Sequence, residues 1–285
     1  MKNLISIVLL LLVANISTAQ QVISIPGEQS VVNIASNGDT MFGTMFTAEG
    51  PGPHPTILIL HGMPGGSVLG AGATSGAGGL TLPLQSAGFN ALIFNYRGAW
   101  GSGGKYSIKG RNEDVHAALA FLVSNSEKYK IDPTRISVVG HSFGGYNAIQ
   151  AGIEDSTFLC TIGIAPLGRR SSSPSPSPEQ ELELDNAIRG LGGYTARDFR
   201  NQRLDIVDLR ILMKGLSGRP LMIIELTQDT VIPKEVVFSY ADAARSAGAA
   251  PFSYVEIDSD HNLRVDGSRE ELAKVVVGWL SENCN

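Results

Sequence analysis

A serine at the centre of a glycine-rich turn is the residue of this chain best suited to covalent chemistry. Ser142 stands in the run Gly-His-Ser-Phe-Gly-Gly, which begins at Gly140 and follows the largely apolar residues 136–139. A sharp turn from a buried strand into a helix exposes one side chain above a sheet, and flanking glycines keep the backbone free of clashes. We therefore predict that Ser142 is a nucleophile. A serine in an ordinary surface loop is the alternative.

A serine hydroxyl needs a base, and histidine is the usual one. The chain has five histidines, of which His261 follows the last predicted strand, residues 252–257, in a loop that should open at the same sheet edge as Ser142. The others fall in a proline-rich approach to a strand, on a helix or in glycine-rich turns: His54, His116, His61 and His141. We predict that His261 is the base, with a solvated loop histidine as the alternative.

An orienting carboxylate should complete the set. Asp229 follows the predicted strand 221–226 directly, so it should reach the same edge, and the chain order Ser, Asp, His is typical of this sheet topology. Asp258 and Asp260 are rivals that would have to fold back on their own loop, and Glu225 lies within the strand. We predict Asp229.

Two backbone N–H groups are candidates to stabilise a negatively charged oxygen at Ser142. Phe143 N–H, at the start of the predicted helix, is the first. Met63 N–H is the second, because residues 61–66 form a glycine-rich loop directly after the predicted strand 56–60. A plain strand-to-helix turn is the alternative interpretation of that loop.

The pattern of apolar runs predicts the elements that position these groups. Asn37-Gly38 between residues 31–35 and 41–46 indicates an antiparallel hairpin at the sheet edge. Short apolar runs, typical of strands buried on both faces, then alternate with helical stretches at 114–128, 236–247 and 269–280. We predict an α/β fold with a mostly parallel central sheet and helices on both faces. The predicted buried strands are residues 56–60, 91–95, 136–140, 158–165, 221–226 and 252–257.

Residues 166–218 depart from this alternation of strands and helices. A Ser/Pro repeat at 171–178 precedes acidic, helix-favouring residues 179–190. We interpret the segment as a helical cap inserted over the sheet, with a disordered excursion as the alternative for its Ser/Pro part.

The first 19 residues have the pattern of a secretory signal. Lys2 precedes the apolar residues 4–14, and small residues end the segment at 17–19. We therefore predict a secreted or periplasmic protein whose mature domain spans residues 20–285, with an uncleaved N-terminal anchor as the alternative. The apolar run is shorter than the about 20 residues that span a bilayer, so no membrane span is expected.

Composition narrows the classes of partner and cofactor. The whole chain has a formal net charge of −5, and Arg169-Arg170 is its one pair of adjacent basic residues, so nucleic acid is a poor partner. No metal-ligand spacing, phosphate loop or dinucleotide fingerprint occurs, so we predict neither a metal nor a cofactor. The two cysteines, Cys160 and Cys284, indicate no disulfide framework, and we expect them to be unbridged although a bridge is sterically conceivable. The sequence leaves the oligomeric state open.

These motifs together resemble the α/β-hydrolase superfamily over residues 31–280. The resemblance is carried by His61-Gly62 with Pro64-Gly65, Tyr96-Arg97-Gly98, the Ser142 motif, Asp229 and His261, and it points to the branch of prolyl oligopeptidase-like and dienelactone hydrolase-like esterases and peptidases. Met63 departs from the glycine often found at its position in that branch.

The resemblance implies transfer of an acyl group to water through an acyl-enzyme. The expected substrate is then a small carboxylic ester or amide. An exopeptidase or acyl-peptide hydrolase is a second hypothesis, and a non-catalytic binding protein with the same fold is a third.

Overall fold

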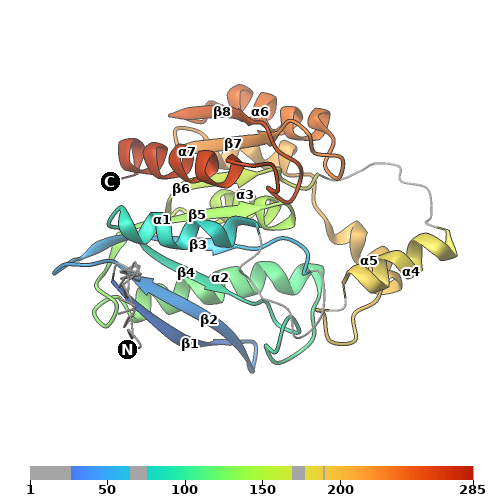
Figure 1. The fold of residues 1–285 in the computed structure, drawn as a ribbon, viewed down its shortest axis with the longest axis horizontal. Helices are drawn as coiled ribbons and strands as arrows, with labels where there is room; N and C mark the ends of the chain where they lie inside the picture. The colour runs from blue at the N-terminus through green and yellow to red at the C-terminus, as the bar shows by residue number, and fades with distance from the viewer. Residues whose placement is uncertain (1–26, 65–75, 169–176, 189, 285) are drawn as a thin grey trace, which may run out of the picture.

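Strands and helices alternate along the chain and build one eight-stranded sheet. In the computed structural model, which describes residues 27–64, 76–168, 177–188 and 190–284, the strand order is β1-β2-β4-β3-β5-β6-β7-β8 (Figure 1). The six strands from β4 to β8 in this order pair in parallel, whereas β1 and β2 pair antiparallel. The predicted mostly parallel sheet is confirmed. Its strands are β1 (Glu28–Ser36), β2 (Asp39–Thr47), β3 (His54–Leu60), β4 (Asn90–Phe94), β5 (Ile131–His141), β6 (Phe158–Ile164), β7 (Leu221–Leu226) and β8 (Phe252–Ile257).

The N-terminal hairpin forms where the Asn-Gly pair predicted it. Asn37 and Gly38 have φ angles of 52° and 85°, the left-handed pair that a tight two-residue turn requires. β1 lies at the edge of the sheet, and β2 joins the hairpin to β4.

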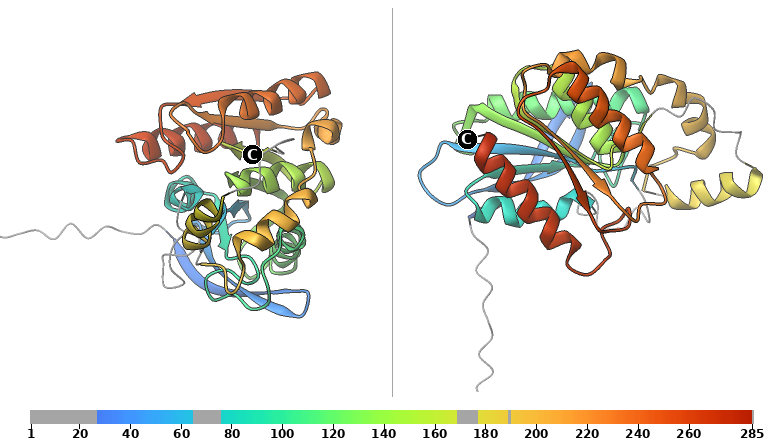
Figure 2. Two further views of the ribbon diagram at one scale, coloured as in Figure 1. Left: turned by 90° about the vertical axis from the view of Figure 1, so that its right-hand side faces the viewer. Right: turned by 90° about the horizontal axis from the view of Figure 1, so that it is seen from above.

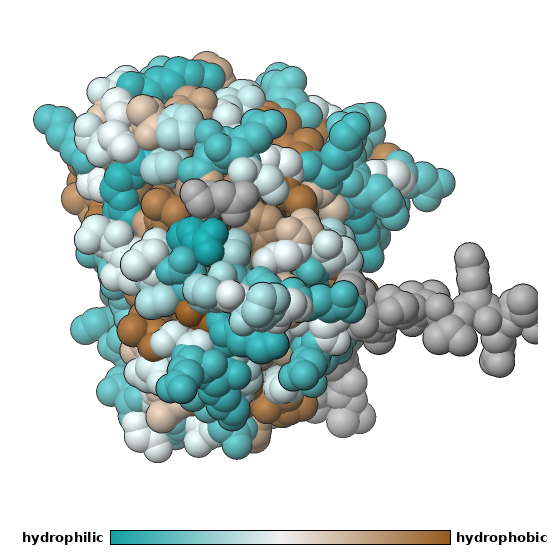
Figure 3. Space-filling view, turned by 90° about the vertical axis from the view of Figure 1, so that its left-hand side faces the viewer, coloured by the Kyte–Doolittle hydropathy of each residue, from teal (hydrophilic) through white to brown (hydrophobic). Residues whose placement is uncertain are grey.

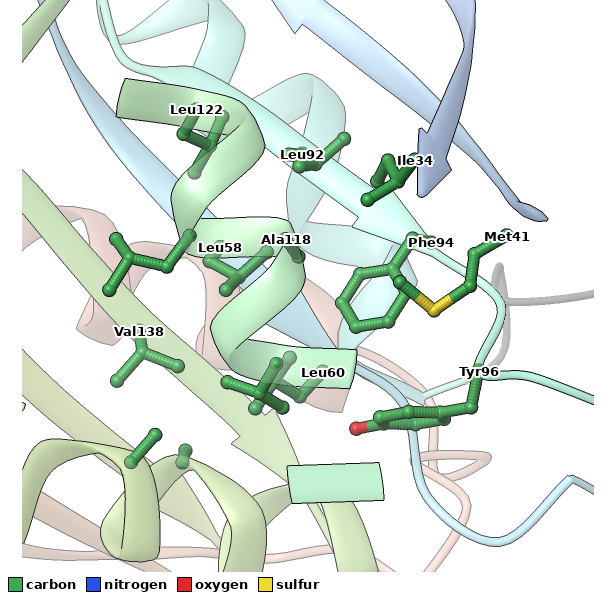
Figure 4. Packing of buried hydrophobic residues seen from close by; sticks show 14 of the residues in the cluster. Ile34, Met41, Leu58, Leu60, Leu92, Phe94, Tyr96, Ala118, Leu122 and Val138 are labelled. Atoms are coloured by element: carbon green, nitrogen blue, oxygen red, sulfur yellow. The ribbon is translucent and has the colours of Figure 1, made fainter. Parts of the chain in front are cut away.

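Helices cover both faces of the sheet, as Figure 2 shows from above. On one face lie α1 (Thr81–Ser86) and α7 (Ser268–Asn283); on the other lie α2 (Ile108–Ser124), α3 (Phe143–Glu154) and α6 (Lys234–Ala247). Alternate residues of each central strand face opposite layers. In β3, Leu58 and Leu60 pack in the cluster that contains α2 (Figure 4), whereas Ile57 and Ile59 pack in the cluster that contains α1 and α7.

Helix α2 begins earlier than the predicted residues 114–128. Ser107 caps it by accepting a hydrogen bond from the N–H of Gly110 at 2.9 Å. Asp114 therefore lies inside the helix, whereas the predicted bounds 114–128 placed it at the N-terminus. Its carboxylate instead accepts hydrogen bonds from Ser36 and Arg97, so it ties the helix to the hairpin and to the loop after β4.

Residues 166–218 contribute two different kinds of structure. The helices α4 (Pro178–Ala187) and α5 (Ala196–Gln202) project to one side of the sheet (Figure 1). The 3₁₀ helices η3 (Arg203–Asp205) and η4 (Leu209–Leu216) follow, and η4 packs between α3 and α6 in the helix layer. Much of the predicted Ser/Pro loop, residues 169–176, lies outside the described residues, as does the predicted signal segment 1–19.

The expectation that the cysteines are unbridged is wrong. Cys160 on β6 and Cys284 after α7 form a disulfide, with their Cα atoms 6.1 Å apart. The reason is the path of α7, which crosses the sheet face and ends beside β6 (Figure 1). Both cysteines lie in the same buried cluster, so the bridge fastens the C-terminal helix to the sheet.

Within the described ranges, no helix has the length and apolar character needed to cross a bilayer. On the side of the molecule opposite α4 and α5, hydrophilic residues surround scattered hydrophobic ones (Figure 3).

Candidate active site

Ser142 occupies the turn between β5 and α3. Its φ of 58° and ψ of −120° are unusual for a residue with a side chain, and such strain is typical of functional turns. A Cβ at Gly140 would overlap the backbone of Gly144, and a Cβ at Gly144 would overlap the carbonyl groups of Leu60 and His61. The two flanking glycines therefore let the strand, the helix and the loop after β3 approach closely at the serine.

His261 and Asp229 meet Ser142 at this turn. His261 Nε2 lies 3.0 Å from Ser142 Oγ, and His261 Nδ1 lies 2.6 Å from an oxygen of Asp229. The side chains of His261 and Asp229 are 12% and 2% exposed, so the carboxylate is shielded while the imidazole keeps an open edge. The three residues that the sequence predicted thus form one continuous chain of hydrogen bonds.

The carboxylate of Asp229 is held in its ionised form. It accepts hydrogen bonds from the backbone N–H groups of Val231 and Ile232 at 2.7 and 2.8 Å. Burial alone would raise the pKa of Asp229, but these bonds and the one with His261 lower it below its ordinary value. An anion at this place favours the tautomer of His261 that carries its proton on Nδ1 and leaves Nε2 free to accept the serine proton.

The predicted oxyanion donors lie on two segments that meet beside Ser142. Phe143 is the first residue of α3, and Met63 follows Gly62, where an added Cβ would lie 3.6 Å from Ser142 Oγ. Within the part of the chain that the structure describes, neither the Phe143 N–H nor the Met63 N–H donates a hydrogen bond to another protein group. With respect to the described residues, both N–H groups are therefore available to a ligand oxygen.

The alternatives weighed for the base and the carboxylate lie elsewhere. Asp258 accepts hydrogen bonds from Thr227 and Gln228, Asp260 pairs with Arg264, and Glu225 bonds the hydroxyl of Tyr254. His116 bonds Glu154, and His61 lies in the loop after β3, where its Nδ1 bonds the carbonyl of Gly62. Among the described residues, none of these side chains forms a hydrogen bond or ion pair with the side chain of Ser142 or His261.

The sequence reasoning missed the role of His141, the residue before Ser142. Its Nε2 donates a hydrogen bond of 2.8 Å to the carbonyl of His261, and the two rings lie 4.8 Å apart. Burial, with the neighbouring His261, lowers the pKa of His141 to about 4, so the ring is neutral near pH 7. His141 therefore fixes the backbone of the loop that carries His261. The only sequence signal for this role was the position of His141 directly before Ser142. That position is equally consistent with an ordinary residue of the turn.

The loop after β4 is held by α2. Arg97 donates to the carboxylates of Asp114 and Glu113 at 2.5 and 2.7 Å, so these ion pairs fasten the loop to the helix. The same loop carries Trp100, whose ring lies 4.8 Å from that of His61. Over the described ranges, no group of three or more His, Cys, Asp or Glu side chains could hold a metal ion.

Comparison with known proteins agrees with the fold of the chain. A family model described as BD-FAE matches residues 45–163, which include Met63 and Ser142 but end before Asp229 and His261. An α/β hydrolase from Penicillium has a solved structure with a TM-score of 0.69 at 16% identity, covering 90% of this chain and 99% of its own. The chain has the α/β-hydrolase fold. An esterase of Pyrococcus furiosus shares this fold with a TM-score of 0.65 and 20% identity, over 91% of this chain and 94% of the esterase.

Sequence relatives of this α/β-hydrolase-fold chain match over shorter stretches. Acylamino-acid-releasing enzyme 2 of Oryza sativa subsp. japonica is 34% identical over 131 residues, which are 44% of this chain and 16% of that enzyme. An uncharacterised protein of Mycobacterium tuberculosis is 29% identical over 130 residues, 46% of this chain and 43% of its own length. The chain thus spans less than half of these curated relatives. The predicted resemblance to α/β-hydrolases of the esterase and peptidase type is confirmed.

Proposed function

We propose that this protein is an exported serine hydrolase that cleaves carboxylic esters or small amides through an acyl-enzyme on Ser142. The hydrogen-bonded chain from Asp229 through His261 to Ser142 is the observation that carries the proposal. The resemblance of the chain to esterases and acylamino-acid-releasing enzymes supports it. The proposal of export rests on the sequence pattern of residues 1–19 alone.

In the proposed reaction, His261 Nε2 takes the proton of Ser142 as Oγ attacks the carbonyl carbon of the substrate. The negative oxygen that forms accepts hydrogen bonds from the N–H groups of Met63 and Phe143. His261 then gives its proton to the departing alcohol or amine, and the acyl group stays on Ser142. His261 then takes a proton from a water molecule as that water attacks the acyl-enzyme. When the bond between the acyl carbon and Ser142 Oγ breaks, His261 returns the proton to Oγ and the carboxylic acid leaves.

A fluorophosphonate probe tests the nucleophile directly. We expect the wild type to be labelled at Ser142, Ser142→Ala to be unlabelled, and Ser239→Ala to be labelled like the wild type, because Ser239 bonds Val236 and Arg210 on the surface of α6. Equal labelling of the wild type and Ser142→Ala would refute catalysis by this serine. Export is tested separately by sequencing the N-terminus of the protein recovered outside the cytoplasm, where cleavage after residue 19 is expected.

Similarity to acylamino-acid-releasing enzymes favours a second candidate, hydrolysis of N-acylated peptides. Esters and amides of the same acyl group distinguish the two. An esterase should turn over p-nitrophenyl acetate and butyrate but not N-acetylalanine p-nitroanilide, whereas an acyl-peptide hydrolase should cleave the anilide with a comparable kcat/KM. Tight binding of an ester without turnover would instead favour a non-catalytic binding protein.

A further inference from the structure

A buried arginine lies behind the proposed oxyanion site and plays no part in the steps above. Arg111, in the first turn of α2, has no exposed surface. Unlike Arg97, it has no carboxylate partner among the described residues. The guanidinium remains protonated at any physiological pH, so a full positive charge is enclosed in the protein.

Among the described residues, Arg111 donates two hydrogen bonds to the loop that carries Met63, one to the hydroxyl of Tyr106 at 2.7 Å and one to Asn147. Nη2 donates to the carbonyl of His61 at 3.0 Å, and Nη1 donates to the carbonyl of Gly62 at 3.4 Å. The carbonyl of Gly62 and the N–H of Met63 belong to the same peptide unit. A donor on the carbonyl oxygen of a peptide polarises that unit and makes its N–H a stronger donor.

The guanidinium of Arg111 also contacts Phe143, the residue of the other predicted donor. Its Cζ lies 4.2 Å from the ring centre of Phe143 and 4.0 Å from that of Tyr96. Nε donates to the side chain of Asn147, one turn further along α3, at 2.8 Å. One side chain therefore links the loop after β3 to the first turn of α3, and these two segments carry the Met63 and Phe143 amides.

His61 does not supply a competing charge. Burial, with the adjacent Arg111, lowers the pKa of His61 to about 3, so its ring is neutral and its Nδ1–H adds a second hydrogen bond of 2.8 Å to the carbonyl of Gly62. Arg111 is thus the single cation at this carbonyl among the described residues.

Stability alone does not account for a cation at this position. Desolvating a charge costs several kcal/mol in practice, and well-packed apolar residues of similar volume often stabilise a protein as much or more. A methionine is unbranched and nearly as long, so it could pack against the rings of Tyr96 and Phe143 without a charge. A fixed positive charge has a clear advantage only if a negative charge forms nearby during function.

We infer that Arg111 is a positioning residue for the oxyanion site, which orients and polarises the peptide of Met63 and favours negative charge on the bound substrate oxygen. This inference rests on the proposed hydrolase function. It predicts that Arg111 acts on the transition state rather than on the bound substrate, because it would influence the substrate oxygen through the Met63 peptide and not by direct contact.

The test compares turnover with the binding of an anionic tetrahedral mimic. In Arg111→Met, kcat for p-nitrophenyl butyrate should fall about 10- to 100-fold with KM changed by less than about 3-fold, and the Ki of butylboronic acid should rise in parallel with the loss of kcat. Arg111→Lys keeps the charge but not the forked donors, and should lose less. If Arg111→Met does not fold, the same comparison of kcat, KM and Ki is made with Arg111→Lys and Arg111→Gln.

Arg97→Met is the matched control, since Arg97 is also a largely buried arginine beside α2 but contacts Asp114 and Glu113 instead of the loop after β3. It should lower the melting temperature while kcat and the boronate Ki of the folded protein stay within about 2-fold of the wild type. An active wild type whose kcat and Ki are unaffected by Arg111→Met would overturn this inference alone. A wild type that is inactive on every ester and unlabelled at Ser142 would instead overturn the proposed function.

Discussion

Two buried neutral histidines should make this protein unstable in mild acid. His61 and His141 are 1% and 6% exposed, and each gives one ring proton to a backbone carbonyl. Burial lowers the pKa of His61 to about 3 and that of His141 to about 4, from an ordinary value of 6.5. Because both folded-state values lie below the unfolded-state value, the unfolded chain binds more protons, and stability falls as the pH falls from 6.5 toward 4.

The size of the effect follows from the number of protons. Well inside this window, unfolding takes up two protons, so the free energy of unfolding changes by about 3 kcal/mol for each pH unit. Between pH 7.5 and pH 5, the two histidines together should remove about 4 kcal/mol. The hydrogen bond with Glu154 raises the pKa of His116, which opposes this loss, because His116 binds its proton more tightly in the folded state.

Urea unfolding followed by circular dichroism from pH 7.5 to pH 5, with the disulfide intact, measures this slope. Above pH 5, Glu154, whose pKa is lowered to about 2 chiefly by its hydrogen bond with His116, contributes little to the slope. His61→Asn and His141→Gln each place an amide N–H near the original donor nitrogen and cannot titrate. Each should remove about half of the slope, and the double variant should remove most of it.

A free energy of unfolding that stays flat between pH 7.5 and pH 5 would refute this reasoning. So would a slope that survives unchanged in the double variant, because the protons would then bind elsewhere. The His116→Gln variant lacks the group that opposes the loss of stability. Its free energy of unfolding should therefore fall slightly more steeply with decreasing pH than that of the wild type.

Two further predictions concern the carboxylate and the disulfide. Asp229→Asn should lower kcat for p-nitrophenyl butyrate by about 10³- to 10⁴-fold, because an amide at this position favours the wrong tautomer of His261. The control variant Asp258→Asn should keep a kcat within about 3-fold of the wild type. Comparable losses of kcat in the two variants would contradict the assignment of Asp229. Replacing both Cys160 and Cys284 by alanine opens a loop with a sequence separation of 124 residues. This double variant should lower the free energy of unfolding by up to about 5 kcal/mol in urea titrations, and an unchanged urea midpoint would show that the bridge adds no stability.

Much of the fold could be predicted from the sequence because its signals are local. The apolar run of β7 agrees with the predicted bounds 221–226, and Asn37-Gly38 marks the hairpin turn, since both depend on neighbouring residues only. The start of α2 was missed because its first turn, from Ile108, lacks acidic residues, and its cap at Ser107 is a common residue type with no distinctive context.

Contacts between distant segments could not be predicted in the same way. The bridge between Cys160 and Cys284 depends on where α7 ends relative to β6, which only the packing of the helix on the sheet decides. The hydrogen bond from His141 to the His261 carbonyl and the hydrogen bonds from Arg111 to the loop after β3 join residues 120 and about 50 positions apart. No periodicity in the chain encodes them.

The sequence by itself determined which residue types stand at the ends of the parallel strands, because the apolar strand runs end shortly before Ser142, Asp229 and His261, and glycines mark the turn at Ser142. Only the tertiary structure decided how those side chains meet: the 3.0 and 2.6 Å contacts of His261, the closed disulfide and the buried charge of Arg111. The physical reason is that strand and turn propensities act over a few neighbouring residues, whereas hydrogen-bond distances and burial arise from segments brought together when the core packs.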